Sequence, residues 1–498
     1  MIDLTSGRIA EITGGDLIDG QADNAEVTGP AEFDSRKVVP GAIFMALPGA
    51  NVDGHDYVTA AAENGAALSI VGRSVGQPAL LAQPVEDDEA QRAMSNSAAF
   101  EADADGSGAA VLRAIDRLAR YNTDVLAEEE GMTVVGVTGS AGKTSTKDLI
   151  GALLRTQGDT VAPPGSFNNE IGLPYTALRA NRETKFLIAE MSARGIGHIR
   201  HLTTVTPPRI GVVLNVGSAH LGEFGSRSAI AQAKGELIEA LPDANAGGIA
   251  VLNADDEQVA GMAPRMQARV VTFGVRKKAD YWASDVRLDE VARASFTLHH
   301  PHGEPVAVSL GVFGAHQVSN ALAAAAVAME TGMSADDVAA TLRDHVAASV
   351  NRMDVRTRGD GVTVINDSYN ANPESMRAGI DALAYTATGR PQAASWAVLG
   401  QMGELGDDAT EEHAALGDVL GQRRIDNAVI VGNGVNQRAL VDSAKRNGVH
   451  THGVEDIDAA VNFLDQQLKE NDVVLVKASY ADGPVSYTHL TLSTILLV

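Results

Sequence analysis

One segment of the chain carries the side chains of a phosphate-binding loop. It reads Gly136-Val137-Thr138-Gly139-Ser140-Ala141-Gly142-Lys143-Thr144-Ser145, after a predicted strand and before a predicted helix over 146–154. In such a loop glycines let backbone N–H groups close around phosphate oxygens, the lysine reaches the terminal phosphates, and the Thr hydroxyl coordinates Mg²⁺. The strict motif has glycine where Val137 stands, so the loop is a variant. The segment predicts that the chain binds a nucleoside triphosphate.

Three single residues are candidates for chemistry beside that loop. Glu190 ends the apolar strand 186–189 and is placed to bind a metal ion, although an isolated carboxylate there is more often only solvated. His220 follows the apolar run 212–216, at the edge where open α/β sheets gather ligands, although a lone histidine is more often structural. Lys234, on a predicted helix over 230–241, is by default a solvated helix lysine.

Polar residues gather at three further places. A loop over 366–375 follows the predicted strand 362–365 and is rich in Asn, Asp and Ser, a composition that either binds a ligand or caps a helix. Residues 314–320 precede an alanine-rich helix and are equally compatible with a capping turn. Arg352 lies where one run of strands and helices gives way to the next.

The length and composition of the chain limit the classes of protein to which it can belong. The 498 residues exceed one compact core, since domains average about 150 residues. Lys plus Arg number 39 and Asp plus Glu 64, so a net charge of −25 disfavours a nucleic-acid partner. The chain has no cysteine, which excludes disulfides, thiolate metal sites and a cysteine nucleophile. The first residues lack the pattern of a signal peptide, and no apolar run is long enough to span a bilayer, so we expect a cytoplasmic protein without membrane insertion.

The order of elements predicts an α/β protein of three domains. Short β and turn units fill residues 1 to about 85, and an acidic linker over 86–108 closes a first domain of residues 1–108. A helix over 109–127 opens a second domain, 109–348, in which strands and helices alternate to about residue 345, the pattern of a parallel sheet. Further alternation over 349–498 predicts a smaller doubly wound domain, except that the tail 484–498 carries no charged residue.

Together these segments resemble the Mur ligase family from about Asp34 to Ser479. The family has an aliphatic residue where the strict phosphate loop has glycine, which accounts for Val137. The segments 165–174, 219–221, 233–236 and 367–373 resemble those of the family branch that adds D-alanyl-D-alanine, and the last of them differs in sister ligases. In the first domain, 34–38, 44–47 and 53–56 resemble the segments that hold the UDP-sugar end of the substrate.

The resemblance implies an N-terminal substrate domain, a central parallel-sheet P-loop ATPase domain and a C-terminal Rossmann-like domain. It implies ATP and Mg²⁺, with Lys143 and Thr144 on the phosphates and metal and Glu190 and His220 holding magnesium. Lys234 aligns with a lysine that is carbamylated in sister ligases. The residues that the resemblance assigns to ATP are Thr138, Gly139, Ser140, Ala141, Gly142, Lys143, Thr144, Ser145, Asn320, Arg352 and Asp367. Those that it assigns to the other substrates are Ser35, Arg36, Asn168, Asn169, Tyr369, Asn370 and Asn372.

The implied reaction joins UDP-N-acetylmuramoyl-tripeptide to D-alanyl-D-alanine through an acyl phosphate, in a protein expected to be a monomer. The chain departs from the family at Gln317, where Asn is usual, and at Tyr480, where Arg is usual. From about Gly483 the similarity stops, and the uncharged tail indicates a truncated or wrongly joined reading frame. Two other hypotheses stay open: a related ligase with another acceptor, such as a sister muramoyl ligase or a folylpolyglutamate synthase, and a nucleotide-binding protein without ligase activity.

Overall fold

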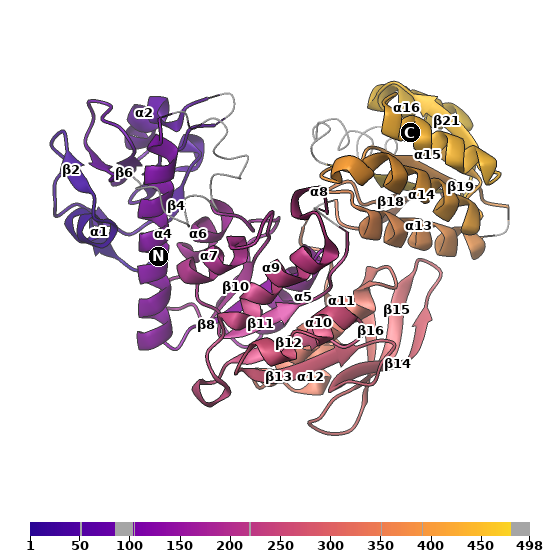
Figure 1. Ribbon diagram of the computed structural model, residues 1–498, viewed down its shortest axis with the longest axis horizontal. Coiled ribbons are helices and arrows are strands. Elements are labelled where there is room, and N and C mark those ends of the chain that lie inside the picture. The colour runs from indigo at the N-terminus through magenta and orange to yellow at the C-terminus, as the bar shows by residue number, and fades with distance from the viewer. Residues whose placement is uncertain are drawn as a thin grey trace.

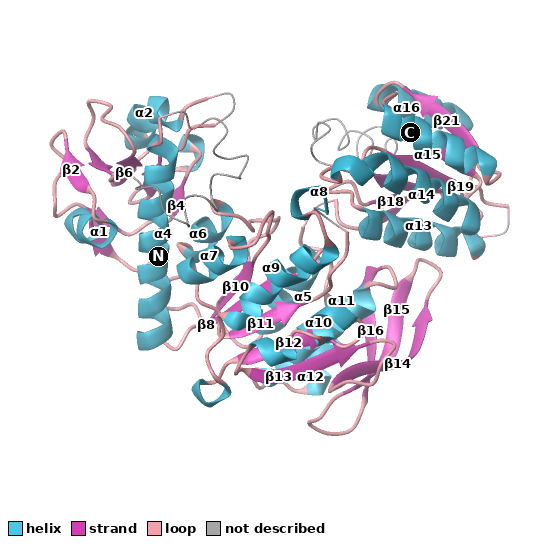
Figure 2. Cartoon of the chain, in the orientation of Figure 1, coloured by secondary structure: helices cyan, strands magenta, loops and turns pink. Residues whose placement is uncertain are grey.

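The computed structural model describes residues 1–49, 52–84, 103, 105–218, 221–349, 351–390 and 392–479. Three larger sheets follow one another along the described chain, and Figure 1 shows them as three bodies with the central one between the other two. Each sheet has helices beside it (Figure 2), as expected of an α/β protein. The acidic segment 86–102, His220 and the uncharged tail 484–498 lie outside the described residues.

The first body is built on a small mixed sheet. Its strand order is β2-β7-β6-β5-β4, with parallel pairing throughout except between β2 and β7. The strands are β2 (Asp16–Ile18), β4 (Ala31–Glu32), β5 (Ile43–Met45), β6 (Leu68–Val71) and β7 (Ala79–Leu81). A two-stranded sheet of β1 (Leu4–Thr5) and β3 (Glu26–Val27) and the helices α1 (Ser6–Thr13) and α2 (Val58–Glu63) complete it.

A long helix, α4 (Ser107–Glu129), joins the first body to the central one. It packs against α1 and β6 on one side and against α6 (Gly172–Ala177) and α7 (His198–Val205) on the other (Figure 1). Inside this joint the buried Asn122 accepts a hydrogen bond from the Ile2 N–H and donates to the carbonyls of Ala177 and Ala180. The helix therefore belongs to both cores, and the sequence prediction of a helix over 109–127 is confirmed with two more residues at each end.

The central sheet has nine strands in the order β16-β15-β14-β13-β12-β11-β8-β10-β9. They are β8 (Thr133–Thr138), β9 (Thr160–Val161), β10 (Phe186–Glu190), β11 (Ile210–Val213), β12 (Ile249–Asn253), β13 (Arg269–Gly274), β14 (Tyr281–Leu288), β15 (Arg293–His299) and β16 (Val306–Phe313). Its helices include α5 (Lys143–Arg155), α8 (Leu221–Phe224), α9 (Arg227–Glu239), α10 (Glu257–Ala260), α11 (Gln317–Glu330) and α12 (Ala335–Asp344).

One part of the central sheet contradicts the sequence prediction. Strands β9 to β14 pair in parallel as expected, but β14, β15 and β16 form an antiparallel meander. The short connections 289–292 and 300–305 reverse the chain directly between neighbouring strands, as in β-hairpins. The expectation of parallel alternation to residue 345 is therefore wrong for 281–313.

The third sheet has six strands in the order β17-β18-β22-β19-β20-β21, parallel except for β17 against β18. They are β17 (Asp354–Thr357), β18 (Thr363–Asn366), β19 (Ser395–Leu399), β20 (Asn427–Val431), β21 (His450–Val454) and β22 (Val473–Lys477). Helices α13 (Pro373–Thr388), α14 (Ala409–Gln422), α15 (Val435–Arg446) and α16 (Ile457–Gln467) accompany them. Among the described residues, no helix is both long and apolar enough to cross a membrane.

Two glycines let α9 approach the central sheet closely. Gly136 and Gly211 are register partners on β8 and β11. A Cβ built on Gly136 would lie 2.7 Å from a methyl carbon of Leu237, and one on Gly211 would lie 3.3 Å from Leu237 Cγ. Leu237 is fully buried, in an interior that is generally close-packed. The close approach sets the distance between α9 and the strand that leads into the phosphate loop.

We predict that Gly136→Val lowers the free energy of unfolding by about 1–3 kcal/mol, because the new side chain overpacks the space that Leu237 fills. Urea unfolding followed by circular dichroism measures the change. The matched control is Gly453→Val on β21, where no atom lies within 4 Å of the added Cβ. Equal unfolding midpoints for the two variants would contradict the packing argument.

Candidate active site

The phosphate loop turns from β8 into α5 through residues 139–142. Gly142 has a φ of 85°, a left-handed conformation that favours glycine, and it caps the N-terminus of α5. The side chain of Asn215, just after β11, accepts hydrogen bonds from the N–H groups of Ser140 and Ala141, both at 2.9 Å, and donates to the Ala141 carbonyl. The loop is thus fixed from the neighbouring strand, with its helix N-terminus directed at the space where a phosphate would bind.

Lys143 and Thr144 are the first two residues of α5, three residues earlier than the helix start that the sequence predicted. The Lys143 ammonium donates to the Gly139 carbonyl at 2.8 Å and so folds back over the loop. Burial lowers the pKa of this amine, and the charges of Glu190 and Glu404 oppose that shift. Two carboxylates therefore act on the lysine at the centre of the site.

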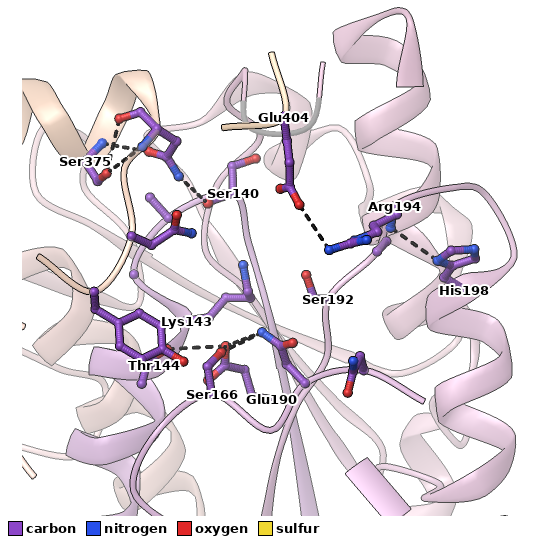
Figure 3. A pocket seen from close by; sticks show the side chains of 18 of the residues that line it. Ser140, Lys143, Thr144, Ser166, Glu190, Ser192, Arg194, His198, Ser375 and Glu404 are labelled. Atoms are coloured by element: carbon purple, nitrogen blue, oxygen red, sulfur yellow. Dashed lines mark hydrogen bonds and ion pairs between the residues drawn. The ribbon is translucent and has the colours of Figure 1, made fainter. Parts of the chain in front are cut away.

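Glu190, at the end of β10, collects hydrogen bonds on one oxygen. Oε1 accepts from Ser166 at 2.7 Å, from the Asn168 amide at 2.8 Å and from the Thr144 hydroxyl at 3.3 Å. Figure 3 shows Ser166, Glu190 and Thr144 together below Lys143. The other oxygen, Oε2, is buried and has no hydrogen-bond partner among the described residues. An unsatisfied carboxylate oxygen beside a Thr hydroxyl fits the hard oxygen ligands that Mg²⁺ prefers.

Arg352 reaches the phosphate loop from the third body. It precedes β17, and its guanidinium donates to the Thr144 hydroxyl at 3.3 Å. The guanidinium carbon lies 4.1 Å from the centre of the Tyr369 ring, a cation–π contact that holds the arginine in place. Burial raises the pKa of the Tyr369 hydroxyl. A cation from one body is therefore placed on a phosphate-loop hydroxyl of another.

A buried ion pair shapes the loop that carries Tyr369. Lys477, the last residue of β22, is 1% exposed and contacts Asp367 Oδ2 at 2.5 Å. The same ammonium donates to the Asn370 carbonyl at 2.9 Å, and Asp367 also accepts from the Met353 N–H at 3.2 Å. The lysine thus fixes both the polar loop and the chain next to Arg352.

The start of α13 contacts the central body directly. Asn372 caps this helix through a capping box with Ser375, and its amide donates to the Ser140 carbonyl at 3.4 Å. Glu374 Oε1 accepts from the N–H and hydroxyl of Ser218 at 2.7 and 2.9 Å. Its Oε2 is buried and has no hydrogen-bond partner in the part of the chain that the structure describes. The polar loop predicted from sequence both caps a helix and faces the phosphate loop.

Two cavities adjoin the phosphate loop and share Ala141, Gly142, Arg352 and Ser375. The first, of about 260 Å³ (Figure 3), holds these predicted site residues: Ser140, Lys143, Thr144, Asn168, Asn169, Glu190, Tyr369, Asn370 and Asn372. The second, of about 390 Å³, holds Ser145, Asn320 and Asp367. Most of the predicted residues, from segments far apart in sequence, are therefore brought around one centre.

The structure leaves some predicted residues away from these cavities. Ser35 and Arg36 lie on a single 3-10 turn of the first body, where the 87% exposed Arg36 side chain pairs with Asp34. Thr138 is fully buried at the end of β8. Lys234 is also buried, so its interpretation as a solvated lysine is wrong. Burial lowers the pKa of its amine well below the ordinary value, and the Lys143 charge adds to the shift.

Sequence reasoning missed five residues that the structure places at the centre. Ser166 and Glu374 lie within segments that were singled out, yet neither was assigned a role there. Arg194, His198 and Glu404 line the first cavity but belong to no motif, because each is one polar residue in an ordinary stretch. Only their arrangement in space gives them significance.

Comparison with known proteins identifies the family. Family models match the chain as Mur ligase family catalytic domain (residues 32–119), Mur ligase middle domain (137–328) and Mur ligase glutamate ligase domain (351–480). A UDP-N-acetylmuramoyl-tripeptide–D-alanyl-D-alanine ligase from Mycobacterium tuberculosis is 50% identical over 504 residues, covering 97% of this chain and 96% of that protein. The chain belongs to the Mur ligase family. The resemblance drawn from the motifs is thereby confirmed.

Solved Mur ligases share the architecture. MurF from Acinetobacter baumannii superposes with a TM-score of 0.80 at 27% identity and covers 98% of both chains. MurF from Thermotoga maritima in complex with ADP gives a TM-score of 0.74 at 28% identity, covering 93% of this chain and 97% of that one. The three-domain α/β fold of a Mur ligase is therefore confirmed for this chain.

Lys234 gives a prediction about stability and pH. A lysine in an unfolded chain has a pKa of about 10.4, so below that pH Lys234 carries a proton in the unfolded chain. The folded Mur ligase binds the same proton more weakly, because burial lowers the pKa of Lys234. Stability of the parent protein should therefore rise with pH towards about 10.4. Lys234→Met has no titrating group at this position, so its stability should not rise in this way. The gain in stability of Lys234→Met over the parent should therefore be largest near neutral pH and become smaller as the pH rises.

Urea midpoints between pH 7 and 10, in bicarbonate-free buffer, measure this difference. Lys445→Met, at an exposed position of α15, is the control and should show no such trend. A difference between Lys234→Met and the parent that does not change with pH would show that the buried amine stays charged.

Proposed function

We propose that this Mur ligase joins D-alanyl-D-alanine to UDP-N-acetylmuramoyl-tripeptide and converts ATP to ADP and phosphate. The observation that carries the proposal is the first cavity, in which the phosphate loop of the central body faces the polar loop 366–375 of the third. The named activity of the M. tuberculosis relative, at 50% identity over nearly the whole chain, supports the same substrates.

The reaction needs three groups to meet in one enclosed place. A carboxylate oxygen of the tripeptide attacks the γ-phosphorus of ATP, ADP leaves, and an acyl phosphate forms. The amine of the dipeptide then attacks the carbonyl carbon, loses a proton and displaces phosphate. No protein nucleophile is required, so catalysis consists of positioning, charge neutralisation and exclusion of water. A cavity shared by two bodies suits that task.

The residues around the phosphate loop divide into cations and oxygen ligands. Lys143 and Arg352 neutralise the transferred phosphate, and the backbone N–H groups of the loop bind its oxygens. Asn320 and Asp367 line the second cavity, where the remainder of the nucleotide would lie. Arg352 borders both cavities, which supports a role for it between the nucleotide and the acyl group.

Glu190 and Thr144 are the described residues that would hold Mg²⁺, with His220 as the further ligand that the family resemblance implies. The bound ion would neutralise phosphate oxygens as charge develops on them. The buried free oxygen of Glu190 supports this assignment. Lys234 lies beneath the same region as a buried amine, a state compatible with the carbamylation implied by the family.

The other substrates would approach from opposite sides. Asn168 and Asn169 would contact the muramoyl-peptide, and Ser35 and Arg36 of the first body would hold its UDP-sugar end. Tyr369, Asn370 and Asn372 would line the entry of the dipeptide. We further propose domain limits at 1–108, 109–348 and 349–498, a monomeric state and a cytoplasmic location, where these soluble precursors would be available.

Phosphate release from ATP by the purified protein tests the function. With UDP-N-acetylmuramoyl-tripeptide present, release should require both Mg²⁺ and D-alanyl-D-alanine. Lys143→Ala should reduce it by at least a hundredfold, because one charge on the transferred phosphate is lost. Release with another acceptor instead of the dipeptide would indicate a sister ligase. A folded protein that binds ATP without release under any condition would indicate a nucleotide-binding protein without ligase activity.

Glu190→Gln tests the metal assignment. The amide oxygen still accepts from Ser166 and Asn168, but the negative charge is lost. We expect the Mg²⁺ concentration for half-maximal activity to rise about tenfold and kcat to fall about a hundredfold, with little change in melting temperature. Glu183→Gln, at an exposed position before β10, should leave all three unchanged. An unaltered Mg²⁺ dependence in Glu190→Gln would contradict the assignment.

A further inference from the structure

An ion pair between two bodies crosses the first cavity from the side of the phosphate loop to the opposite wall. Arg194, in the segment between β10 and α7, contacts Glu404 of the third body at 3.1 Å. Both residues line the cavity, and Figure 3 shows the pair reaching across it between Ser140 and His198. Neither residue has a part in the function proposed above.

The pair is poorly explained as a stabilising salt bridge. The two side chains are 40% and 39% exposed, and ion pairs this exposed contribute little to stability. Glu404 nevertheless has a φ of 61°, in the left-handed region that non-glycine residues rarely adopt. Such strain tends to persist where a side chain is aimed at a ligand. The backbone conformation here directs a carboxylate into the cavity.

The loop around Glu404 is held rigidly on both sides. Met402 and Leu405 are buried, and the Met402 N–H donates to the buried His413 ring at 3.0 Å. Gly406 approaches Gly222 of the central body so closely that a Cβ on Gly406 would lie 2.6 Å from Gly222 Cα. The backbone that carries Glu404 is therefore fixed by packing.

Three other charged groups of the cavity have partners at the phosphate loop, whereas Glu170, which also lines the cavity, interacts electrostatically with Arg194. Lys143 lies over Gly139, Glu190 binds Ser166 and Thr144, and Arg352 stacks on Tyr369. The Arg194–Glu404 pair extends from this centre to the far wall, since Figure 3 shows the Glu404 carboxylate between Lys143 and Arg194, and the backbone N–H of Arg194 donates to the His198 ring. Going away from the phosphate loop, the cavity wall therefore carries first the Glu404 carboxylate and then the Arg194 guanidinium.

We propose that Arg194 and Glu404 form the binding site for a zwitterionic acceptor, with Glu404 holding its ammonium group near the phosphate loop and Arg194 its carboxylate farther away. The inference rests on the proposed function, whose acceptor is a free dipeptide. The ammonium nitrogen and carboxylate carbon of an extended dipeptide are about 6 Å apart. In the absence of substrate the two side chains pair with each other, and the acceptor exchanges that contact for its own two charges.

This arrangement places the amine where the reaction needs it. Figure 3 shows the Glu404 carboxylate between Lys143 and Arg194, so the nitrogen is held on the side of the acyl phosphate, which it attacks after the ammonium group gives one proton to water. The guanidinium can bind the carboxylate with two parallel hydrogen bonds. The pair also selects its substrate: an acceptor without a terminal carboxylate leaves Arg194 bound to Glu404, which then competes with the ammonium group. Arg194 is therefore a specificity-determining residue.

The test compares D-alanyl-D-alanine with its C-terminal amide, which keeps the amine and lacks the carboxylate. The full-length parent protein should prefer the acid by about ten- to a hundredfold in kcat/KM, the range for a charge-assisted contact. Arg194→Met should remove that preference while the KM values for ATP and UDP-N-acetylmuramoyl-tripeptide stay within twofold. Arg194→Lys should restore part of it through a point charge.

Glu404→Gln should behave differently, because both acceptors carry the ammonium group. Its KM should rise about tenfold for acid and amide alike, with the preference for the acid retained. The control is Arg343→Met, since Arg343 forms a surface pair with Asp344 on α12 that is more exposed and lies outside both cavities. It should match the parent in every constant.

The outcomes separate this inference from the proposed function. If the parent ligates the dipeptide and Arg194→Met keeps the preference for the acid, the acceptor site is wrong. A change in the KM for the UDP-tripeptide instead would place a carboxylate of the other substrate on Arg194 and would also overturn it. A parent protein that ligates neither acceptor would overturn the proposed function itself. ATP binding and melting temperature confirm that each variant is folded.

Discussion

The contact of Arg352 with the Thr144 hydroxyl is the interaction on which the arrangement of the site depends. Phosphoryl transfer needs cations around a charge that spreads over several oxygens, and the phosphate loop offers only Lys143 and its own N–H groups. The further cation comes from the third body, where Tyr369 stacks on it and the buried Lys477 fixes the loop that carries Tyr369. Neither body alone has a complete set of groups, so the site exists only where the two meet.

The rest of the fold brings the groups of the two bodies together. Parallel strands gather their carboxyl ends at one edge of each sheet, which puts the phosphate loop, Glu190 and Asn215 at the edge of the central sheet. In the third sheet the same rule places the loop after β18 beside Lys477 at the end of β22. Contacts from α13, above all Glu374 with Ser218, hold the two edges face to face. The first body is joined through α4, whose buried Asn122 ties three segments together.

Much of the fold and of the candidate site could be predicted from sequence, because residues adjacent in the chain determine them. Glycines, Lys143 and Thr144 between a strand and a helix defined the loop, and apolar runs predicted strands such as 395–399 and 186–190 to the residue or nearly so. The antiparallel meander was missed because strand composition does not reveal pairing direction. The burial of Lys234 was missed because a lysine on a helix is ordinarily solvated. Arg194, Glu404 and Glu374 were missed since each acts only through partners distant in sequence.

The most direct test of the account follows one oxygen atom. UDP-N-acetylmuramoyl-tripeptide labelled with ¹⁸O in its terminal carboxylate is incubated with ATP, Mg²⁺ and D-alanyl-D-alanine, and the released phosphate is examined by mass spectrometry. If the carboxylate attacks the γ-phosphorus between Lys143 and Arg352, each released phosphate carries one oxygen from the labelled carboxylate. Phosphate without the label, formed at the rate of peptide ligation, would contradict attack by the carboxylate and with it the role assigned to the shared site.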